Sequence, residues 1–104
     1  MILTAHVNHD GQKVVAIIDD ELLGRRIDGG DVELKFDSLF YKGDQKDEAT
    51  ILREIRQAYM LNCAGERTIA FLKEHGFVAH EDVAIIEGVP YVYVIFSGKD
   101  DPEQ

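Results

Sequence analysis

The sequence predicts an α+β protein in which a small mixed sheet of about four strands, starting with an antiparallel hairpin, packs against two consecutive helices. Two observations carry this prediction. Residues 2–8, 13–19, 32–36 and 91–96 have the alternation, or the β-branched and aromatic composition, that is typical of strands. Between the third and fourth of these segments, apolar side chains recur at three- and four-residue steps, as they do in amphipathic helices.

Size and charge limit the class of the protein. With 104 residues, 45% of them apolar, the chain can bury one core without disulfide or metal support. We therefore expect a single domain over residues 1–98 and a disordered acidic tail over 99–104. The 20 acidic side chains exceed the 11 basic ones and give a net charge of -9. This charge opposes non-specific binding to phosphate backbones or anionic lipid, so nucleic-acid binding needs a local basic patch.

The sequence contains no pattern that predicts export or membrane insertion. Residues 1–6 lack a basic leader, and no apolar run approaches the ~20 residues that span a bilayer. Cys63 is the only cysteine, so no intramolecular disulfide can form and no oxidising compartment is indicated. We expect a cytoplasmic protein without a membrane anchor.

The first two strands are predicted to pair as a hairpin. Leu3, Ala5 and Val7 alternate with polar residues, and residues 13–19 are rich in valine and isoleucine. The Asp10-Gly11 pair between them suits a tight turn. A short helical turn should follow at residues 19–23, before the alternating strand at 32–36.

Two helices are predicted in the middle of the chain. The first covers residues 47–61, with an apolar stripe that includes Ile51 and Ile55. The second should follow almost at once, with Asn62 as its N-cap and Gly76 at its C-terminal stop.

The end of the chain is predicted to return to the sheet. Residues 80–86 could open with one further short turn. The strand at 91–96 is apolar on both faces, which favours an interior position in the sheet.

The preferred functional locus comprises Asn62, Gly65, Glu66 and Arg67. A helix N-terminus offers free N–H groups to an anion, and Arg67 could add a bidentate clamp for phosphate or carboxylate. The structural alternative is that Asn62 caps the helix, Gly65 permits close helix packing, and Glu66 pairs with Arg67. The structural alternative is favoured, because capping alone explains half of these residues.

A nucleic-acid surface is a second candidate. Arg53 and Arg56 lie three residues apart on one predicted helix face, where Arg67, Arg25 and Arg26 could join them. A salt-bridged helix surface is the more common meaning of such a pattern.

Metal and thiol chemistry are disfavoured. His6 and His9 should lie on opposite faces of a strand, and the acidic clusters lack calcium-loop spacing, so we expect no metal ion and no cofactor. Cys63 could have its pKa lowered at a helix start, but no local arrangement selects a base for it, and a buried structural thiol is the better interpretation.

Five short motifs occur along the chain in this order: Glu21-Leu22-Leu23-Gly24, Gly30-Asp31-Val32, Phe40-Tyr41-Lys42-Gly43, Asn62 with Gly65-Glu66-Arg67, and Gly88-Val89-Pro90. In this order and spacing the chain resembles, over nearly its whole length, an archaeal family known as domain of unknown function 424. The resemblance implies a stand-alone archaeal domain and no established activity. Cys63 departs from the family pattern, in which an apolar residue is usual.

Three classes of function remain open. The leading hypothesis is a non-enzymatic binding or interaction module, with RNA, the translation apparatus or another protein as candidate partners. The alternative is a small enzyme or anionic-ligand binder that uses the helix N-terminus at Asn62–Arg67. The third is self-association as a homo-oligomer, because an apolar strand can be buried against a second copy as well as inside one chain.

Overall fold

A computed structural model describes residues 1–96 and has the α+β architecture that the sequence predicts. The expected number of about four strands is too low, because within residues 1–96 the main sheet has six strands in the order β5-β1-β2-β6-β8-β7 and a separate two-stranded sheet pairs β3 with β4. The predicted tail at 99–104 lies outside the described residues. The strands are β1 (Ile2–Val7), β2 (Lys13–Ile18), β3 (Arg26–Asp28), β4 (Glu33–Lys35), β5 (Asp44–Gln45), β6 (Met60–Ala64), β7 (Ala84–Ile86) and β8 (Val89–Ile95).

The N-terminal hairpin is confirmed. β1 and β2 pair antiparallel, with Leu3 opposite Ile17. β2 then pairs in parallel with β6, which lies more than forty residues further along the chain, so that Val14 is opposite Met60. The short turn expected at residues 19–23 is the 3-10 helix η1 (Asp20–Leu22), and that expected near residue 80 is the 3-10 helix η3 (His80–Asp82).

The first helix begins where the sequence predicts and ends earlier. α1 covers Glu48–Gln57, and the Asp47 side chain caps it by accepting a hydrogen bond from Thr50 N at 2.8 Å. The prediction that this helix continues to residue 61 is wrong. Ala58 already has extended backbone angles, and Tyr59 N donates to Lys13 O at 2.8 Å, which joins the chain to the sheet.

The prediction of two consecutive helices with Asn62 as an N-cap is also wrong. Residues Met60–Ala64 form strand β6, which lies between β2 and β8, and α2 covers Glu66–Glu74. β6 is central in the sheet, and Leu61 and Cys63 on one face and Ala64 on the other are buried. A strand buried on both faces does not alternate in polarity, so its composition resembles that of a buried helix.

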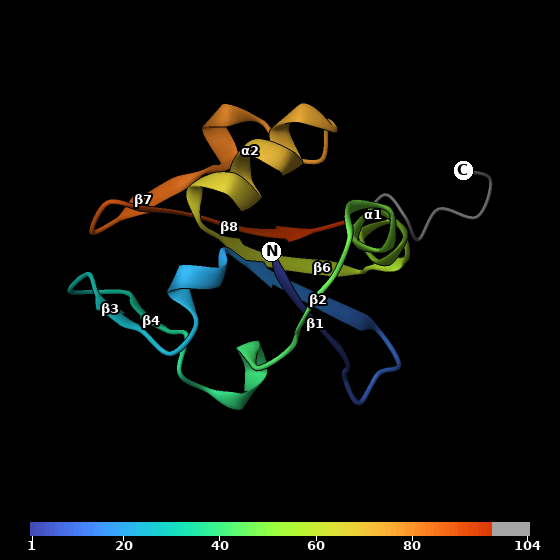
Figure 1. The fold of residues 1–104 in the computed structure, drawn as a ribbon, viewed down its shortest axis with the longest axis horizontal. Helices are drawn as coiled ribbons and strands as arrows, with labels where there is room; N and C mark the ends of the chain where they lie inside the picture. The colour runs from blue at the N-terminus through green and yellow to red at the C-terminus, as the bar shows by residue number, and fades with distance from the viewer. Residues whose placement is uncertain (97–104) are drawn as a thin grey trace.

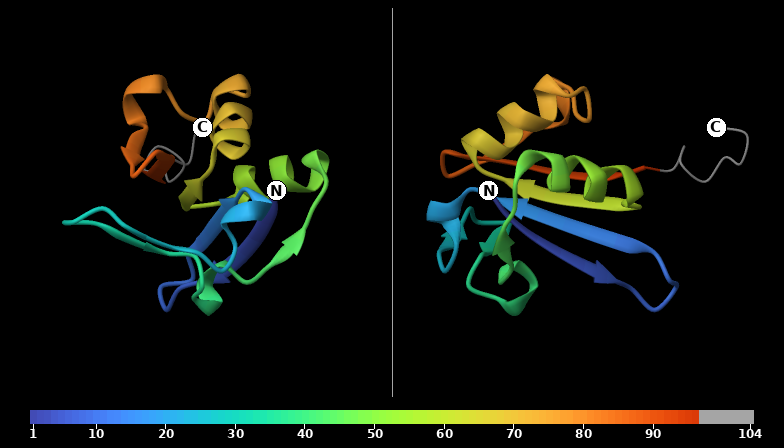
Figure 2. Two further views of the ribbon diagram at one scale, coloured as in Figure 1. Left: turned by 60° about the vertical axis from the view of Figure 1, so that its left-hand side comes forward. Right: turned by 45° about the vertical axis from the view of Figure 1, so that its right-hand side comes forward.

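The two faces of the sheet are covered differently. α1 and α2 lie on one face (Figure 1), where side chains such as Ile17, Leu61, Ile51 and Leu72 form one core cluster. The segment that contains η1, β3, β4 and the 3-10 helix η2 (Leu39–Tyr41) lies on the other face, as both views of Figure 2 show. There Ile18 packs in a second cluster. We call these the helix face and the hairpin face.

The last strand is only partly interior. β8 pairs with β6 along Tyr91–Ile95 but with β7 only along Val89–Tyr91. Val92 is buried under the helices, whereas Tyr93 and Ile95 on the hairpin face are exposed, so the expectation that both faces are covered is wrong there. The reason is that the segment over residues 20–41 covers only part of this face.

None of the helices within residues 1–96 combines the length and apolar character that a membrane-spanning helix needs.

Candidate functional site

The residues of the predicted locus lie on two different surfaces. Asn62 is on β6, in line with Ala16 of β2 and Tyr93 of β8, and is half-buried on the hairpin face. Gly65, Glu66 and Arg67 lie at the junction where β6 ends and α2 begins. The structure therefore separates Asn62 from the other three residues.

The N-terminus of α2 is capped by a residue from another strand. Asp19 follows β2, and its side chain, in a residue that is only 2% exposed, accepts hydrogen bonds from Arg67 N at 3.0 Å and Thr68 N at 2.8 Å. Thr68 Oγ1 also donates to it at 2.8 Å. Because β2 and β6 are parallel, their C-terminal ends lie side by side at the same end of the sheet. Asp19, which follows β2, therefore lies beside the start of α2, which follows β6. The Asp19 carboxylate thus accepts the hydrogen bonds of the N–H groups that were expected to bind an external anion.

Gly65 is required at this junction for two reasons. Its φ of 110° lies in the left-handed region that side chains avoid. A Cβ atom at this position would also collide with the Asp19 carboxylate. The predicted role of Gly65 in helix–helix packing is therefore replaced by close contact with a capping side chain.

Arg67 pairs with Glu21 and not with Glu66. The Arg67 Nη2 atom lies 3.2 Å from Glu21 Oε1, and both side chains are exposed, at 63% and 65%. The predicted internal Glu66–Arg67 pair is wrong. An exposed pair of this kind contributes little to stability.

A cavity of about 420 Å³ opens beside this junction. Its lining includes two basic residues, Arg25 and Arg67, and three acidic residues, Asp19, Glu21 and Glu66. Gly88, Val89 and Pro90 also line it. The cavity therefore carries charges of both signs and is not strongly selective for anions.

A second surface is the uncovered part of the hairpin face. The strand registers align His6, Val14, Met60 and Ile95 in a row across β1, β2, β6 and β8. Asn62 and Tyr93 lie in the adjacent row. None of these six side chains is fully buried, and Tyr93 is 53% and Ile95 46% exposed. We call this six-residue surface the open face.

The rim of the open face is held by polar and ring contacts. Tyr41 Oη donates to Asn62 Oδ1 at 3.1 Å, and Tyr93 Oη donates to Met60 Sδ at 3.2 Å. The His6 ring stacks on Phe40, with ring centroids 4.6 Å apart. These contacts fix the orientation of half-buried groups next to the exposed side chains of Tyr93 and Ile95.

Burial also affects the tyrosines beside the open face. It raises the pKa of Tyr41 to about 12. Burial raises the pKa of Tyr91 as well, and nearby Tyr93 adds to this shift. Both hydroxyls are therefore neutral at physiological pH.

The open face was missed in the sequence analysis, although one signal for it exists. Tyr93 and Ile95 belong to a strand that is apolar on both faces, and this was interpreted as an interior position. The same pattern is typical of a strand with one exposed apolar face. The two interpretations differ only in how far the segment over residues 20–41 extends across the sheet, which local sequence does not specify.

The structure does not bring the candidate nucleic-acid residues together. Arg53 and Arg56 are exposed on α1, on the helix face. Arg25 and Arg26 lie in the segment that covers the hairpin face, and Arg26 Nε donates to Asp37 Oδ2 at 2.8 Å. The contiguous arginine patch that would have favoured RNA does not form from these four residues.

Cys63 and the histidines have structural surroundings. Cys63 is on β6 and not in a helix, and burial raises the pKa of its thiol to about 12, which keeps it protonated. Within residues 1–96, no three His, Cys, Asp or Glu side chains are grouped so that they could hold a metal ion. His6 Nε2 instead lies 2.9 Å from Phe40 O.

Comparisons with known proteins agree with the fold and name no activity. The model of a family described as "Protein of unknown function (DUF424)" matches residues 7–96. A crystal structure of an uncharacterized conserved protein from Methanopyrus kandleri is similar, with a TM-score of 0.74 and 24% sequence identity over 89% of this chain and 88% of that chain. No curated protein matches the sequence.

Proposed function

Because the chain belongs to the family of proteins of unknown function DUF424, whose description assigns no activity, we propose a function from the geometry: a non-enzymatic interaction module that binds a partner protein on the open face. The supporting observation is the row of partly exposed side chains that crosses four adjacent strands and that, within residues 1–96, η2 covers only at its His6 end.

The composition of the open face suits a protein interface. Tyr93, Ile95, Met60 and Val14 supply apolar area, and His6 and Asn62 supply polar groups. Aromatic residues and methionine are enriched in the centres of such interfaces, and contiguous exposed apolar surface typically marks a binding site. The side chains project from four hydrogen-bonded strands, β1, β2, β6 and β8, which hold them in place before binding.

An RNA partner is less well supported. Tyrosines on a sheet can stack on bases, but RNA binding also needs cations that neutralise phosphates. Arg53 and Arg56 lie on the opposite side of the sheet from Tyr93, and the chain has a net charge of -9. These charges favour a partner protein over a nucleic acid.

The test is site-specific photo-crosslinking in an archaeal host, with a benzophenone amino acid at position 93 or, as a control, at position 7. Val7 is 69% exposed and belongs to the helix face. We expect a discrete protein adduct from position 93 only, and at least about tenfold weaker binding of the purified partner by Ile95→Lys. Equal adducts from both positions, or a nuclease-sensitive adduct, would contradict the proposal.

One observation favours a second candidate, an anionic small molecule in the cavity beside Arg67. Arg25 and Arg67 both line this cavity. The occupation of Arg67 N and Thr68 N by Asp19 weighs against it. NMR titrations with inorganic phosphate and with acetate test this candidate. It would be supported by saturable chemical-shift changes near Arg67 that are lost in Arg25→Ala and kept in the control Lys35→Ala. Chemical-shift changes that rise linearly without saturation would exclude it.

A further inference from the structure

The β7 edge of the sheet is a second surface, separate from the open face. β7 is the last strand in the order of the main sheet and pairs with β8 on one side. Within the described part of the chain, no strand pairs with its other side. The backbone groups on that side are therefore available to another strand.

The pairing register identifies the available groups. Ile86 and Val89 flank the two-residue turn Glu87-Gly88, so they form a hydrogen-bonded pair. The next pair, Ile85 with Pro90, is then the non-hydrogen-bonded one, which agrees with the missing N–H of Pro90. The N–H and C=O of Ile85 consequently point away from β8, towards the open edge.

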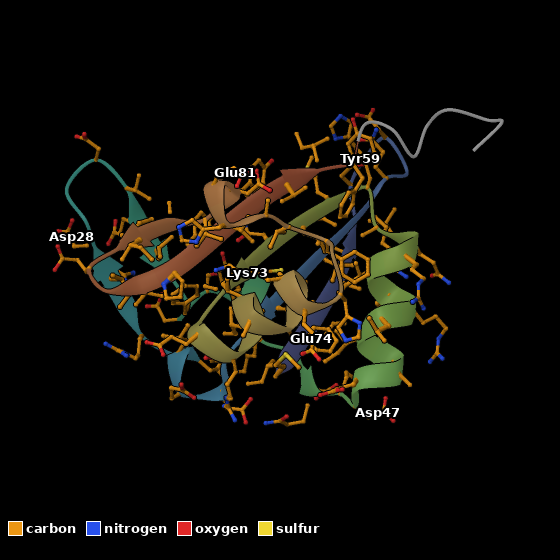
Figure 3. The ribbon with its side chains drawn as sticks, turned by 90° about the horizontal axis from the view of Figure 1, so that it is seen from above. Asp28, Asp47, Tyr59, Lys73, Glu74 and Glu81 are labelled. Atoms are coloured by element: carbon orange, nitrogen blue, oxygen red, sulfur yellow. The ribbon has the colours of Figure 1, made fainter. Side chains whose placement is uncertain are left out.

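An apolar groove adjoins this edge on the helix face. It has a volume of about 620 Å³ and is lined by Ile69 and Ala70 of α2, Pro90 of β8 and Ile85. Ile85 is 66% exposed. Figure 3 shows Lys73 on the side of α2 that faces the segment carrying Glu81, which agrees with the distance of 3.5 Å between Lys73 Nζ and His80 Nδ1. A side chain that enters from the edge would meet Ile85 first and then the groove.

The charges around the edge favour a basic occupant. The exposed carboxylates that line the groove or flank β7 belong to Glu66, Glu74, Glu81, Asp82 and Glu87. Lys73 is the lysine that lines the groove. A second copy of this chain would bring the same carboxylates together across the contact, and like charges oppose such pairing.

We propose that β7 binds, by strand addition, an extended basic segment of a partner protein that carries aliphatic residues at alternate positions. Main-chain hydrogen bonds form at Ile85, aliphatic side chains on one face cover Ile85 and the groove, and lysine or arginine side chains pair with the flanking carboxylates. The proposal goes beyond the function assigned to the open face and uses none of its residues.

The probes are two synthetic octapeptides on the full chain, with isoleucine, valine and leucine at alternate positions and either lysine and arginine or glutamate and aspartate between them. We expect the basic peptide to bind at least about tenfold more tightly than the acidic one. Amide hydrogen exchange at Ile85 should slow when the basic peptide binds, because its outward N–H becomes hydrogen-bonded.

Variants separate the side chain from the backbone. Ile85→Ala removes the aliphatic contact and should weaken binding several-fold. Ile85→Pro also removes the outward N–H, without breaking a bond to β8, and should weaken binding by a further factor of about ten. Val7→Ala and Ile95→Lys are controls on other surfaces and should bind the peptide as the unmodified chain does, so failure here is distinct from failure at the open face.

Three results would overturn the proposal. The first is equal affinity for the two peptides, or binding of neither at millimolar concentration. The second is that the basic peptide slows amide exchange on the open face and leaves exchange at Ile85 unchanged. This measurement uses the unmodified chain, so it does not depend on whether the variants fold. The third is Ile85 protection without peptide that is lost on dilution, which would identify a second copy as the occupant.

Discussion

The Asp19 carboxylate lies against Gly65, in the space that a Cβ atom at that position would need. This contact joins the residue after β2 to the residue before α2. The same carboxylate accepts the hydrogen bonds that the first turn of α2 offers. The junction is therefore explained by the requirements of the fold.

Asp19→Ala should destabilise the protein strongly. The substitution leaves Arg67 N, Thr68 N and Thr68 Oγ1 without their acceptor in a buried environment, and we expect a loss of about 2–4 kcal/mol in the free energy of unfolding. Urea denaturation measures it. Asp47→Ala, which removes the exposed cap of α1, is the control and should have a smaller effect. Equal effects would show that the burial of Asp19 is unimportant.

Gly65→Ala should be more harmful than a glycine substitution that adds only backbone strain. Gly65 combines a positive φ with contact to the Asp19 carboxylate. Gly76 also has a positive φ, of 77°, but apart from its chain neighbours no atom lies within 4 Å of the position that a Cβ would take there. Gly76→Ala should cost about 1 kcal/mol, and Gly65→Ala at least about 1 kcal/mol more. Thermal melts of the two variants compare them. Similar melting temperatures would contradict the close approach at Gly65.

Arg67→Ala should leave stability nearly unchanged. Its ion pair with Glu21 is exposed on both sides, so we expect a change below about 1 kcal/mol. Thr68→Val, at the next position, removes a buried donor to Asp19 and should cost more. Chemical denaturation at matched salt distinguishes them. A large loss of stability in Arg67→Ala would instead indicate a desolvated ion pair.

The free energy of unfolding should fall at alkaline pH because of Tyr41. Its pKa is about 12 in the folded protein and about 10 in an unfolded chain, so the folded state binds the phenolic proton more tightly. The associated stability is present below pH 10 and is lost as the pH rises towards 12, by about 2–3 kcal/mol. Denaturant unfolding between pH 9 and 12 measures the slope. Tyr41→Phe should reduce it, and an unchanged slope would assign the effect to other groups.

The elements predicted correctly are those with strong local signals. The β1–β2 hairpin follows from alternation and an Asp-Gly turn, and the start of α1 follows from the apolar stripe that begins after Asp47. The residues of β6 were assigned to helix because the apolar stripe was taken to continue to Leu61 and because Asn62 suits an N-cap. Only its position between β2 and β8 makes it a strand.

The cap at the candidate site could not be predicted for a related reason. Gly65 and Arg67 are at a helix start, as predicted for that locus, but the acceptor at this helix start, Asp19, is more than forty residues earlier in the sequence. A contact of this length leaves no local pattern. The open face depends likewise on how far residues 20–41 extend over the sheet, which is a property of the tertiary structure.

The parallel pairing of β2 with β6 has a consequence for synthesis of the chain on the ribosome. When β1 and β2 have emerged, the edge of β2 that carries Val15 and Ile17 has no neighbour until β6 follows, after η1, β3, β4, η2, β5 and α1. Closing this long loop costs entropy before the central contacts form, so the nascent N-terminal half exposes an aggregation-prone strand edge. Productive folding in the cell therefore depends on the interval between translation of residue 18 and residue 64.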